Sequence, residues 1–275
     1  MADQGWGRLL EDQVAIVTGA AGSIGSACAR VMANHGARVL VVDLPETPVE
    51  RTVADIVDAD GIARAVESDV SDADDVDTVV DAAMGEWGRL DALVNVAALT
   101  GARLGEDRDV VTMSMESWDR VFAVNLRGAV LCSRRAIPPM LEHGGGAIVN
   151  ISSNAAIQAN TFLCAYSSAK AGLNALTAHI ATAYGKRGIR CNAIMPGLVP
   201  RSTAVASAQV MSDVEGGTLR HTLTTRLGRP DDIANLAAYL ASDTVAGFIT
   251  GQVISVDGGA HVHSPSYADQ DRATG

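Results

Sequence analysis

A tyrosine and a lysine stand four residues apart in the segment Tyr166-Ser-Ser-Ala-Lys170. In a helix this spacing brings the phenol and the ammonium onto one face. A phenol with an ordinary pKa of ~10 is a poor base at neutral pH, and a nearby cation stabilises its phenolate. Lowering that pKa by ~2–3 units corresponds to ~3–4 kcal/mol of differential interaction, so the pair is suited to proton transfer near neutral pH.

Ser153 lies upstream of this pair, just after the apolar run from Ile148 to Ile151, which predicts a buried strand. A hydroxyl at that strand end can hydrogen-bond a substrate oxygen whose charge changes during hydride transfer. Together the three side chains predict acid–base chemistry on an alcohol or carbonyl oxygen.

A glycine-rich loop, Thr18-Gly19-Ala20-Ala21-Gly22-Ser23-Ile24-Gly25, joins the first predicted strand to a helix. Glycines in such a turn let the backbone approach a pyrophosphate, which then lies at the helix N-terminus. An ordinary strand-to-helix turn is the alternative interpretation.

The position of Asp43 favours the nucleotide interpretation. It ends the second predicted strand, where a carboxylate can accept hydrogen bonds from both hydroxyls of an adenosine ribose and repels a 2′-phosphate. No lysine or arginine occurs between Leu44 and Glu50 to receive such a phosphate. The sequence therefore favours NAD over NADP, and the alternative is a solvated carboxylate at a strand end.

Short Val/Ile/Ala-rich runs alternate with helical patterns along the chain. Continuous apolar strands are typical of a parallel sheet buried on both faces, and strand–helix alternation implies right-handed crossovers. The pattern predicts an α/β fold with a doubly wound sheet. Strands are expected at 14–17, 38–42, 63–66, 92–94, 147–151, 189–194 and 253–256, and helices at 23–35, 49–58, 72–87, 118–143, 166–184 and 231–240.

We expect one domain over residues 1–275, because no Pro/Gly-rich linker or internal repeat divides the chain. Its core is expected at 10–259, followed by a polar tail at 260–275. Two irregular stretches, 99–114 and 198–229, follow strands, and in open α/β sheets ligands bind beyond the carboxyl ends of strands. These stretches are therefore expected to line a substrate pocket.

Composition excludes several classes of function. The formal net charge is −11 and 48% of the residues are hydrophobic, which argues against nucleic-acid or anionic-membrane binding and against extensive disorder. No apolar run approaches the ~18 residues of a membrane span, and the N-terminus does not resemble a signal peptide. The four cysteines are far apart, and His261 and His263 lie in the polar tail, where they are expected to be solvated. We therefore expect reduced thiols, a cytoplasmic protein and no metal site.

From about Leu10 to Gly259 the chain resembles the short-chain dehydrogenase/reductase family in its compact, single-domain form. The resemblance implies a Rossmann-like, seven-stranded parallel sheet in the order 3-2-1-4-5-6-7. It also implies a homotetramer formed by the helices at 118–143 and 166–184 and by the segment 231–256. The motifs that carry the resemblance are Thr18–Gly25, Asp69-Val70, Asn95-Val96-Ala97-Ala98, Asn125, Ser153, Tyr166/Lys170, Pro196-Gly197 and Gly251–Gly259.

The resemblance implies four catalytic residues. Tyr166 would be the general acid/base, and Ser153 would orient and polarise the substrate oxygen. Lys170 would bind the nicotinamide ribose and lower the pKa of Tyr166, and Asn125 would hold a water that links Lys170 to solvent. The implied NAD contacts are Gly19, Gly22, Ser23, Ile24, Gly25, Asp43, Asp69, Val70, Asn95, Ala97, Tyr166, Lys170, Pro196, Gly197 and Val199.

Four positions depart from the family pattern. Ser23 stands where the loop usually has glycine, Val96 and Ala98 replace an asparagine and a glycine, and Arg201 replaces a threonine. The chain also continues beyond Gly259, with a tail expected to be disordered alone or, alternatively, to cover the active-site mouth of a neighbouring subunit. None of these departures affects the four residues implied in proton transfer.

The prediction is an NAD-dependent oxidoreductase that interconverts a secondary alcohol and a ketone. One alternative is an NADPH-dependent ketoreductase of the 3-oxoacyl type, which Asp43 disfavours. Another is a nucleotide-binding regulator without catalysis, which would be expected to have lost residues that are intact here. The predicted pocket is mainly apolar and suits a hydrophobic or cyclic alcohol; its apolar side chains are Leu99, Ala155, Ile157, Phe162, Leu163, Leu198, Val199 and Met211.

Overall fold

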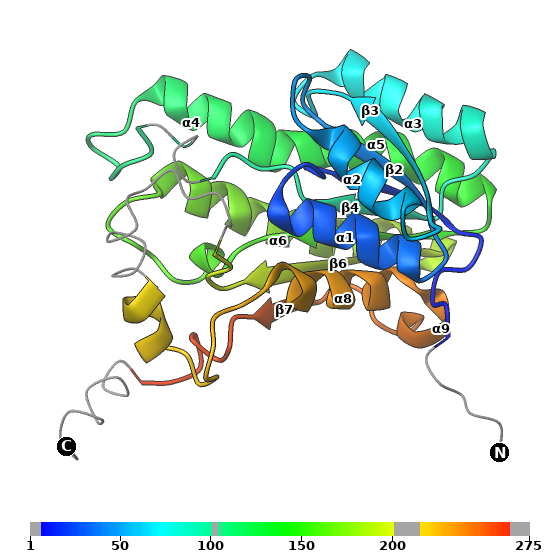
Figure 1. The fold of residues 1–275 in the computed structure, drawn as a ribbon. Coiled ribbons are helices and arrows are strands. Elements are labelled where there is room, and N and C mark those ends of the chain that lie inside the picture. The colour runs from blue at the N-terminus through cyan, green and yellow to red at the C-terminus, as the bar shows by residue number, and fades with distance from the viewer. Residues whose placement is uncertain (1–6, 101–103, 105, 201–214, 265–275) are drawn as a thin grey trace.

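The computed structural model describes residues 7–100, 104, 106–200 and 215–264 (Figure 1). Within these residues seven strands form one parallel sheet in the order β3-β2-β1-β4-β5-β6-β7, which confirms the predicted Rossmann-like fold. The chain order reverses between β1 and β4, and ligands of such sheets bind at that reversal. The strands are β1 (Val14–Thr18), β2 (Arg38–Asp43), β3 (Ile62–Glu67), β4 (Ala92–Asn95), β5 (Gly146–Ile151), β6 (Ile189–Pro196) and β7 (Val253–Val256).

The central strands are buried on both faces, as their continuous apolar runs predict. Every residue of β1, β4 and β6 is buried. The same prediction is wrong for β3, in which Ile62 and Arg64 are exposed while Ala63 and Ala65 pack against the core. The reason is its position, because β3 is an edge strand that pairs only with β2 in the sheet.

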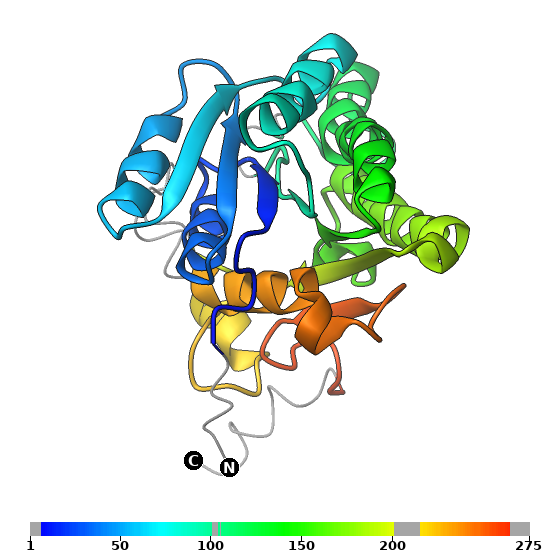
Figure 2. The same ribbon diagram turned by 90° about the vertical axis from the view of Figure 1, so that its right-hand side faces the viewer.

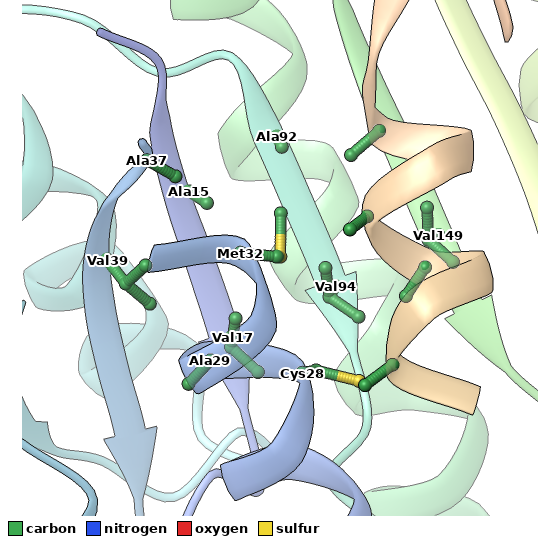
Figure 3. Close-up of a cluster of buried hydrophobic side chains, with 14 of the residues drawn as sticks. Ala15, Val17, Cys28, Ala29, Met32, Ala37, Val39, Ala92, Val94 and Val149 are labelled. Carbon is green, nitrogen blue, oxygen red and sulfur yellow. The ribbon is translucent and has the colours of Figure 1, made fainter. Parts of the chain in front are cut away.

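Helices cover both faces of the sheet (Figure 2). On one face, α1 packs beside α2 and α8, and Figure 3 shows Cys28 and Met32 of α1 directed toward the sheet and α8. On the other face, α3, α5 and α6 form a second layer of the core. The helices are α1 (Ser23–Asn34), α2 (Val49–Val57), α3 (Ala73–Trp87), α4 (Met115–Phe122), α5 (Gly128–Glu142), α6 (Cys164–Tyr184), α8 (Pro230–Ala241) and α9 (Asp243–Ala246).

The helix predicted at 118–143 is longer and is interrupted. It begins with α4 because Ser114 caps it, its Oγ accepting from the N–H of Ser117 at 3.1 Å. A π-helical turn, η2 (Ala123–Arg127), then separates α4 from α5. Such turns are often found at functional sites, and this one carries Asn125.

The ends of most other predicted strands and helices agree with the structure within a few residues. The main error is the stretch 198–229, predicted as irregular, in which residues 215–220 are helical. Short 3₁₀ turns, η3 (Asn154–Ala156) and η4 (Gly185–Arg187), also flank α6 and were not predicted. Among the described helices, none is both long enough and apolar enough to cross a membrane.

Candidate active site

The predicted site residues gather at one edge of the sheet. Because the strands are parallel, β1, β2, β4, β5 and β6 all end at this edge, in Thr18, Asp43, Asn95, Ile151 and Pro196. The loops that follow these strands carry the glycine-rich turn and Ser153, and they lie at the carboxyl ends where such sheets bind ligands.

The glycine-rich loop requires glycine at two of its positions. Gly19 has φ +66°, and a Cβ atom there would lie 2.7 Å from the Cα of Ala97. A Cβ on Gly25 would lie 2.2 Å from the carbonyl oxygen of Gly19. The loop is therefore folded tightly between β1, β4 and α1, as a turn that approaches a pyrophosphate must be.

The N-terminus of α1 is suited to an anion. Gly22 is the N-cap, and within the described residues no side chain forms a capping hydrogen bond there. The first turn, which begins with Ser23 and Ile24, contains no acidic residue. The loop thus presents the positive end of the helix dipole to a phosphate, although Ser23 replaces the usual glycine.

Asp43 lies beside this loop. Its Oδ2 atom accepts from the N–H of Ala21 at 2.8 Å, and its Oδ1 atom accepts from the N–H of Leu44 at 2.8 Å. A carboxylate has about four acceptor positions, so this half-buried group can still accept from the hydroxyls of a ribose. The carboxylate is therefore held next to the glycine-rich loop.

The loop after β4 is bonded to the glycine-rich turn. The hydroxyl oxygen of Thr18 accepts from the N–H groups of Val96 at 3.1 Å and Ala97 at 3.2 Å. The side chain of Asn95 points into the sheet, where its amide donates to Asn150 at 2.8 Å. Asn95 therefore joins β4 to β5, and Val96 and Ala97 are the residues of this motif that contact the glycine-rich loop.

Tyr166 and Lys170 lie on α6 as predicted. The Nζ atom of Lys170 is 5.7 Å from the centroid of the Tyr166 ring and donates to the carbonyl of Ile151 at 2.7 Å. Lys170 is 2% exposed, and this burial lowers its pKa to about 8. Near neutral pH the ammonium is therefore still charged and is held between β5 and the phenol.

Ser153 follows β5 and caps the turn η3, which packs against α6. Its Oγ accepts from the N–H of Ala155 at 3.2 Å. Because the serine oxygen is the acceptor in this bond, its own O–H can still donate to a substrate oxygen.

Asn125 occupies the π turn and uses its side chain on the loop after β4. Its Oδ1 accepts from the N–H of Leu99 at 2.7 Å, and its amide donates to the Leu99 carbonyl at 3.1 Å. Asn125 and Lys170 line one small cavity of about 10 Å³, roughly the size of one water. Asn95 also lines it, and its Oδ1 is buried without a partner in the described residues.

Asp69 and Val70 follow β3. The Oδ1 atom of Asp69 accepts from the backbone and the hydroxyl of Ser71, at 2.9 Å and 2.7 Å, which fixes the turn. Val70 is buried against Gly128 and lines the same small cavity as Asn125. Of this pair, Val70 is the residue that shares the small cavity with Asn125 and Lys170.

Pro196 and Gly197 end β6 and start the next loop. The N–H of Gly197 donates to the carbonyl of Val256 at 3.0 Å, and a Cβ there would lie 2.9 Å from the Cα of Asp257. Val199 packs against the core beside Gly228. Arg201 and Met211 lie outside the described residues.

The start of the C-terminal tail is hydrogen-bonded to the protein, although His261 is exposed and His263 is only half-buried. The Oδ2 of Asp257 accepts from Asn154 Nδ2 at 2.6 Å, and His261 Nδ1 lies 2.6 Å from the same oxygen. Burial raises the pKa of Asp257, but these hydrogen bonds outweigh burial and the pKa is lowered. His263 Nε2 contacts the carbonyl of His221 at 2.6 Å. Residues 260–264 thus lie against the loops that follow β5 and β6.

Comparison with known proteins agrees with this arrangement. A family model described as enoyl-(acyl carrier protein) reductase matches residues 19–261. A probable short-chain type dehydrogenase/reductase of Bradyrhizobium diazoefficiens is 42% identical over 94% of this chain and 91% of that protein. The 7α-hydroxysteroid dehydrogenase of Bacteroides fragilis is 35% identical over 93% of this chain and 97% of its own. The solved structure of a short-chain type dehydrogenase/reductase from Mycobacterium ulcerans has a TM-score of 0.83 and 30% identity, covering 91% of this chain and 90% of that one.

The chain therefore belongs to the short-chain dehydrogenase/reductase family. It is an oxidoreductase of the class that acts on CH–OH groups, and members of this family use nicotinamide cofactors.

Proposed function

We propose that the protein is an NAD-dependent dehydrogenase that interconverts a secondary alcohol and a ketone. The observation that carries the proposal is the placement of Lys170 beside the Tyr166 ring on α6, with the turn that follows Ser153 packed against the same helix. This set provides a base, a cation that stabilises its ionised form, and a hydrogen-bond donor for the reacting oxygen.

In alcohol oxidation Tyr166 accepts the hydroxyl proton, while Ser153 holds the same oxygen. Lys170 stabilises the phenolate because burial and the Ile151 carbonyl fix its ammonium near the ring. A water in the small cavity shared by Lys170 and Asn125 would connect the ammonium to its polar surroundings, with the unpaired Oδ1 of Asn95 as an acceptor.

NAD is the cofactor that fits the residues present. The turn at Gly22 and the start of α1 would hold the pyrophosphate, and Asp43 would accept from the adenosine ribose. Gly197 and Val199 would pack against the nicotinamide, whose chemistry when bound is to accept the hydride. The 2′-phosphate of NADP would lie next to the Asp43 carboxylate. Two neighbouring negative charges without a cation between them repel each other, which disfavours NADP.

The substrate we propose is an apolar, cyclic secondary alcohol. Leu99 and Leu163 pack in one cluster with Tyr166, so the walls next to the phenol are apolar. Ile157 and Phe162, on the segment between β5 and α6, are each 55% exposed although they are apolar. Exposed apolar side chains near a catalytic group suit an apolar ligand. A relative acts on a hydroxysteroid, which is a polycyclic secondary alcohol.

We also propose that the enzyme is a homotetramer. An apolar groove of about 670 Å³ lies along α5 and α6, with Val130, Ile137, Leu176 and Ile180 among its lining residues. A second exposed apolar region lies near β7, where Phe248 is fully exposed and Val253 is 38% exposed. Apolar surfaces left open on two sides of a subunit suit a symmetric assembly in which other copies cover them.

The direct test is incubation of the protein with NAD and a panel of cyclic, aromatic, steroidal and hydroxy-acid alcohols. The absorbance of the reduced nicotinamide is recorded, and the corresponding ketones are tested with NADH. Reduction of NAD by an apolar cyclic alcohol is the expected result. A preference for NADP(H), or no turnover in either direction across the panel, would contradict the proposal.

A further inference from the structure

The helix that carries Tyr166 and Lys170 does not cap its own N-terminus. Its N-cap residue is Leu163, which has an apolar side chain and a left-handed backbone conformation with φ 70°. The first N–H groups of a helix have no partners within it and must find them elsewhere.

Asp107, from the loop between β4 and α4, provides two of these partners. Its Oδ1 accepts from the N–H of Ala165 at 2.8 Å, and its Oδ2 accepts from the N–H of Tyr166 at 2.9 Å. Asp107 is 6% exposed, so both bonds are shielded from water. One buried carboxylate thus binds the backbone of the residue assigned as the acid/base.

The backbone of the same segment completes the cap. The carbonyl of Asp107 accepts from the N–H of Leu163 at 3.3 Å, and the carbonyl of Arg108 accepts from the N–H of Cys164 at 3.2 Å. The next N–H, that of Ser167, already bonds within the helix to the Leu163 carbonyl at 2.9 Å. The four N–H groups that α6 cannot pair are therefore all bonded to these two residues.

The segment that reaches across α6 is itself fixed; we call Leu104 and residues 106–108 the α6 strap. Leu104 is 7% exposed and packs with Val121 of α4 and Ala165 of α6. Its carbonyl accepts from the Oγ of Ser117 at 3.0 Å. The strap therefore joins α4 to α6 at the end where the phenol lies.

We propose that Asp107 is a positioning residue, which sets the place of Tyr166 by binding its backbone at the capped end of α6. The proposal rests on the role of Tyr166 given above. A small displacement of a reacting group lowers the rate strongly, so a carboxylate that fixes the first turn of this helix acts on catalysis without touching the substrate.

The carboxylate also acts through its charge. Lys170, one turn further along α6, lies 5.7 Å from the Tyr166 ring, and the Asp107 carboxylate binds the Tyr166 N–H at 2.9 Å, so charges of opposite sign act on Tyr166. Arg108, the next residue of the strap, is exposed and therefore screened by water. Asp107 offsets the positive end of the helix dipole, which would otherwise favour the phenolate.

The test compares Asp107→Asn with Asp109→Asn. Asparagine keeps the shape of the side chain at 107 but removes the charge and one acceptor. Asp109 is the matched control, because it is exposed and, within the described residues, its side chain bonds only locally, to the N–H groups of Val111 and Thr112 and to the Thr112 hydroxyl. For Asp107→Asn we expect kcat of alcohol oxidation to fall roughly 10–100-fold, with the dissociation constant of NAD unchanged.

The pH at which the rate of alcohol oxidation rises should also be lower in Asp107→Asn, by about 0.5–1 unit, because loss of the negative charge favours the phenolate. Asp109→Asn should match the unmodified protein.

Two further measurements separate the effect of the Asp107 charge from its effect on the first turn of α6. Asp107→Glu keeps the charge, so it is expected to keep the unmodified pH profile even where kcat falls; a shift as large as that of Asp107→Asn would overturn the role of charge. Amide hydrogen exchange over residues 163–170 should be faster in Asp107→Asn than in Asp109→Asn. Equal exchange together with an unmodified kcat and pH profile would overturn the inference. If the unmodified protein oxidised no alcohol, the proposed function would fail instead, and the exchange comparison would still decide whether Asp107 fixes the first turn of α6.

Discussion

The Nζ atom of Lys170 lies 5.7 Å from the centroid of the Tyr166 ring and is anchored at 2.7 Å to the carbonyl of Ile151. The anchor comes from the last residue of β5, whereas both side chains come from α6. Sheet and helix together therefore keep a buried cation next to the phenol, where weak screening makes its effect on the phenolate large.

Burial of Lys170 predicts an unusual dependence of stability on pH. Its pKa is 10.5 in an exposed chain and about 8 in the folded protein. Below pH 8 the side chain is protonated in both states, and burying the cation destabilises the fold by about 3 kcal/mol. Between pH 8 and 10.5 the unfolded state binds more protons, so this destabilisation is progressively removed as pH rises.

The matched comparison is Lys170→Met, which has no titrating group at this position. Urea unfolding at pH 7.5 and pH 10 should show the free energy of unfolding of the unmodified protein rising relative to that of the variant. Burial raises the pKa of Cys28, Cys132 and Cys191 to about 12, but these thiols are present in both proteins and cancel. If the free energy of unfolding changed with pH in the same way in both proteins, Lys170 would not be desolvated as described.

The carboxylate of Asp43 predicts the choice of cofactor. The unmodified protein should have kcat/KM with NAD at least about tenfold above that with NADP, equivalent to ~1.4 kcal/mol. Asp43→Ala should narrow this difference because the repulsion of a 2′-phosphate is removed. Steady-state kinetics with both cofactors measure the ratio, and equal use of NAD and NADP by the unmodified protein would refute the role of Asp43.

The groove along α5 and α6 predicts that subunits associate through this face. Val130 lines the groove and is 37% exposed in the single chain, so Val130→Asp should lower the mass measured by light scattering without unfolding the subunit. Val57→Asp is the control, because Val57 is 53% exposed at the end of α2 on the opposite face of the sheet. A concentration-independent monomer for the unmodified protein would exclude the tetramer.

Local patterns were sufficient to predict most of the fold and the central pair of the site. Val14 to Val17 and the other apolar runs show no alternation of apolar and polar residues. Strands of this kind are typical of a parallel sheet that is buried on both faces. The spacing of Tyr166 and Lys170 predicts one helix face, and the strand end at Asp43 predicts a carboxylate beside the glycine loop. Each of these inferences depends on residues close together in the chain.

The features that were not predicted depend on contacts between distant segments. Asp107 caps a helix that begins 57 residues later, and nothing in the irregular stretch around it indicates that partner. The bond from Asn154 to Asp257 spans 103 residues and brings His261 to the site edge in the same way. The exposure of Ile62 follows from the position of β3 at the sheet edge, which its own sequence does not encode.

The central claim is that the phenol of Tyr166 transfers the proton in a reaction that reduces NAD. The most direct test is the rate of NADH formation from NAD and an alcohol substrate in Tyr166→Phe, with Tyr184→Phe as the control at the far end of α6. Tyr166→Phe removes only a hydroxyl, so NAD should still bind while kcat falls by roughly 10²–10⁴. Tyr184→Phe should keep the unmodified rate. A Tyr166→Phe protein that forms NADH at a near-normal rate would contradict the account, because the proton would then be transferred by another group.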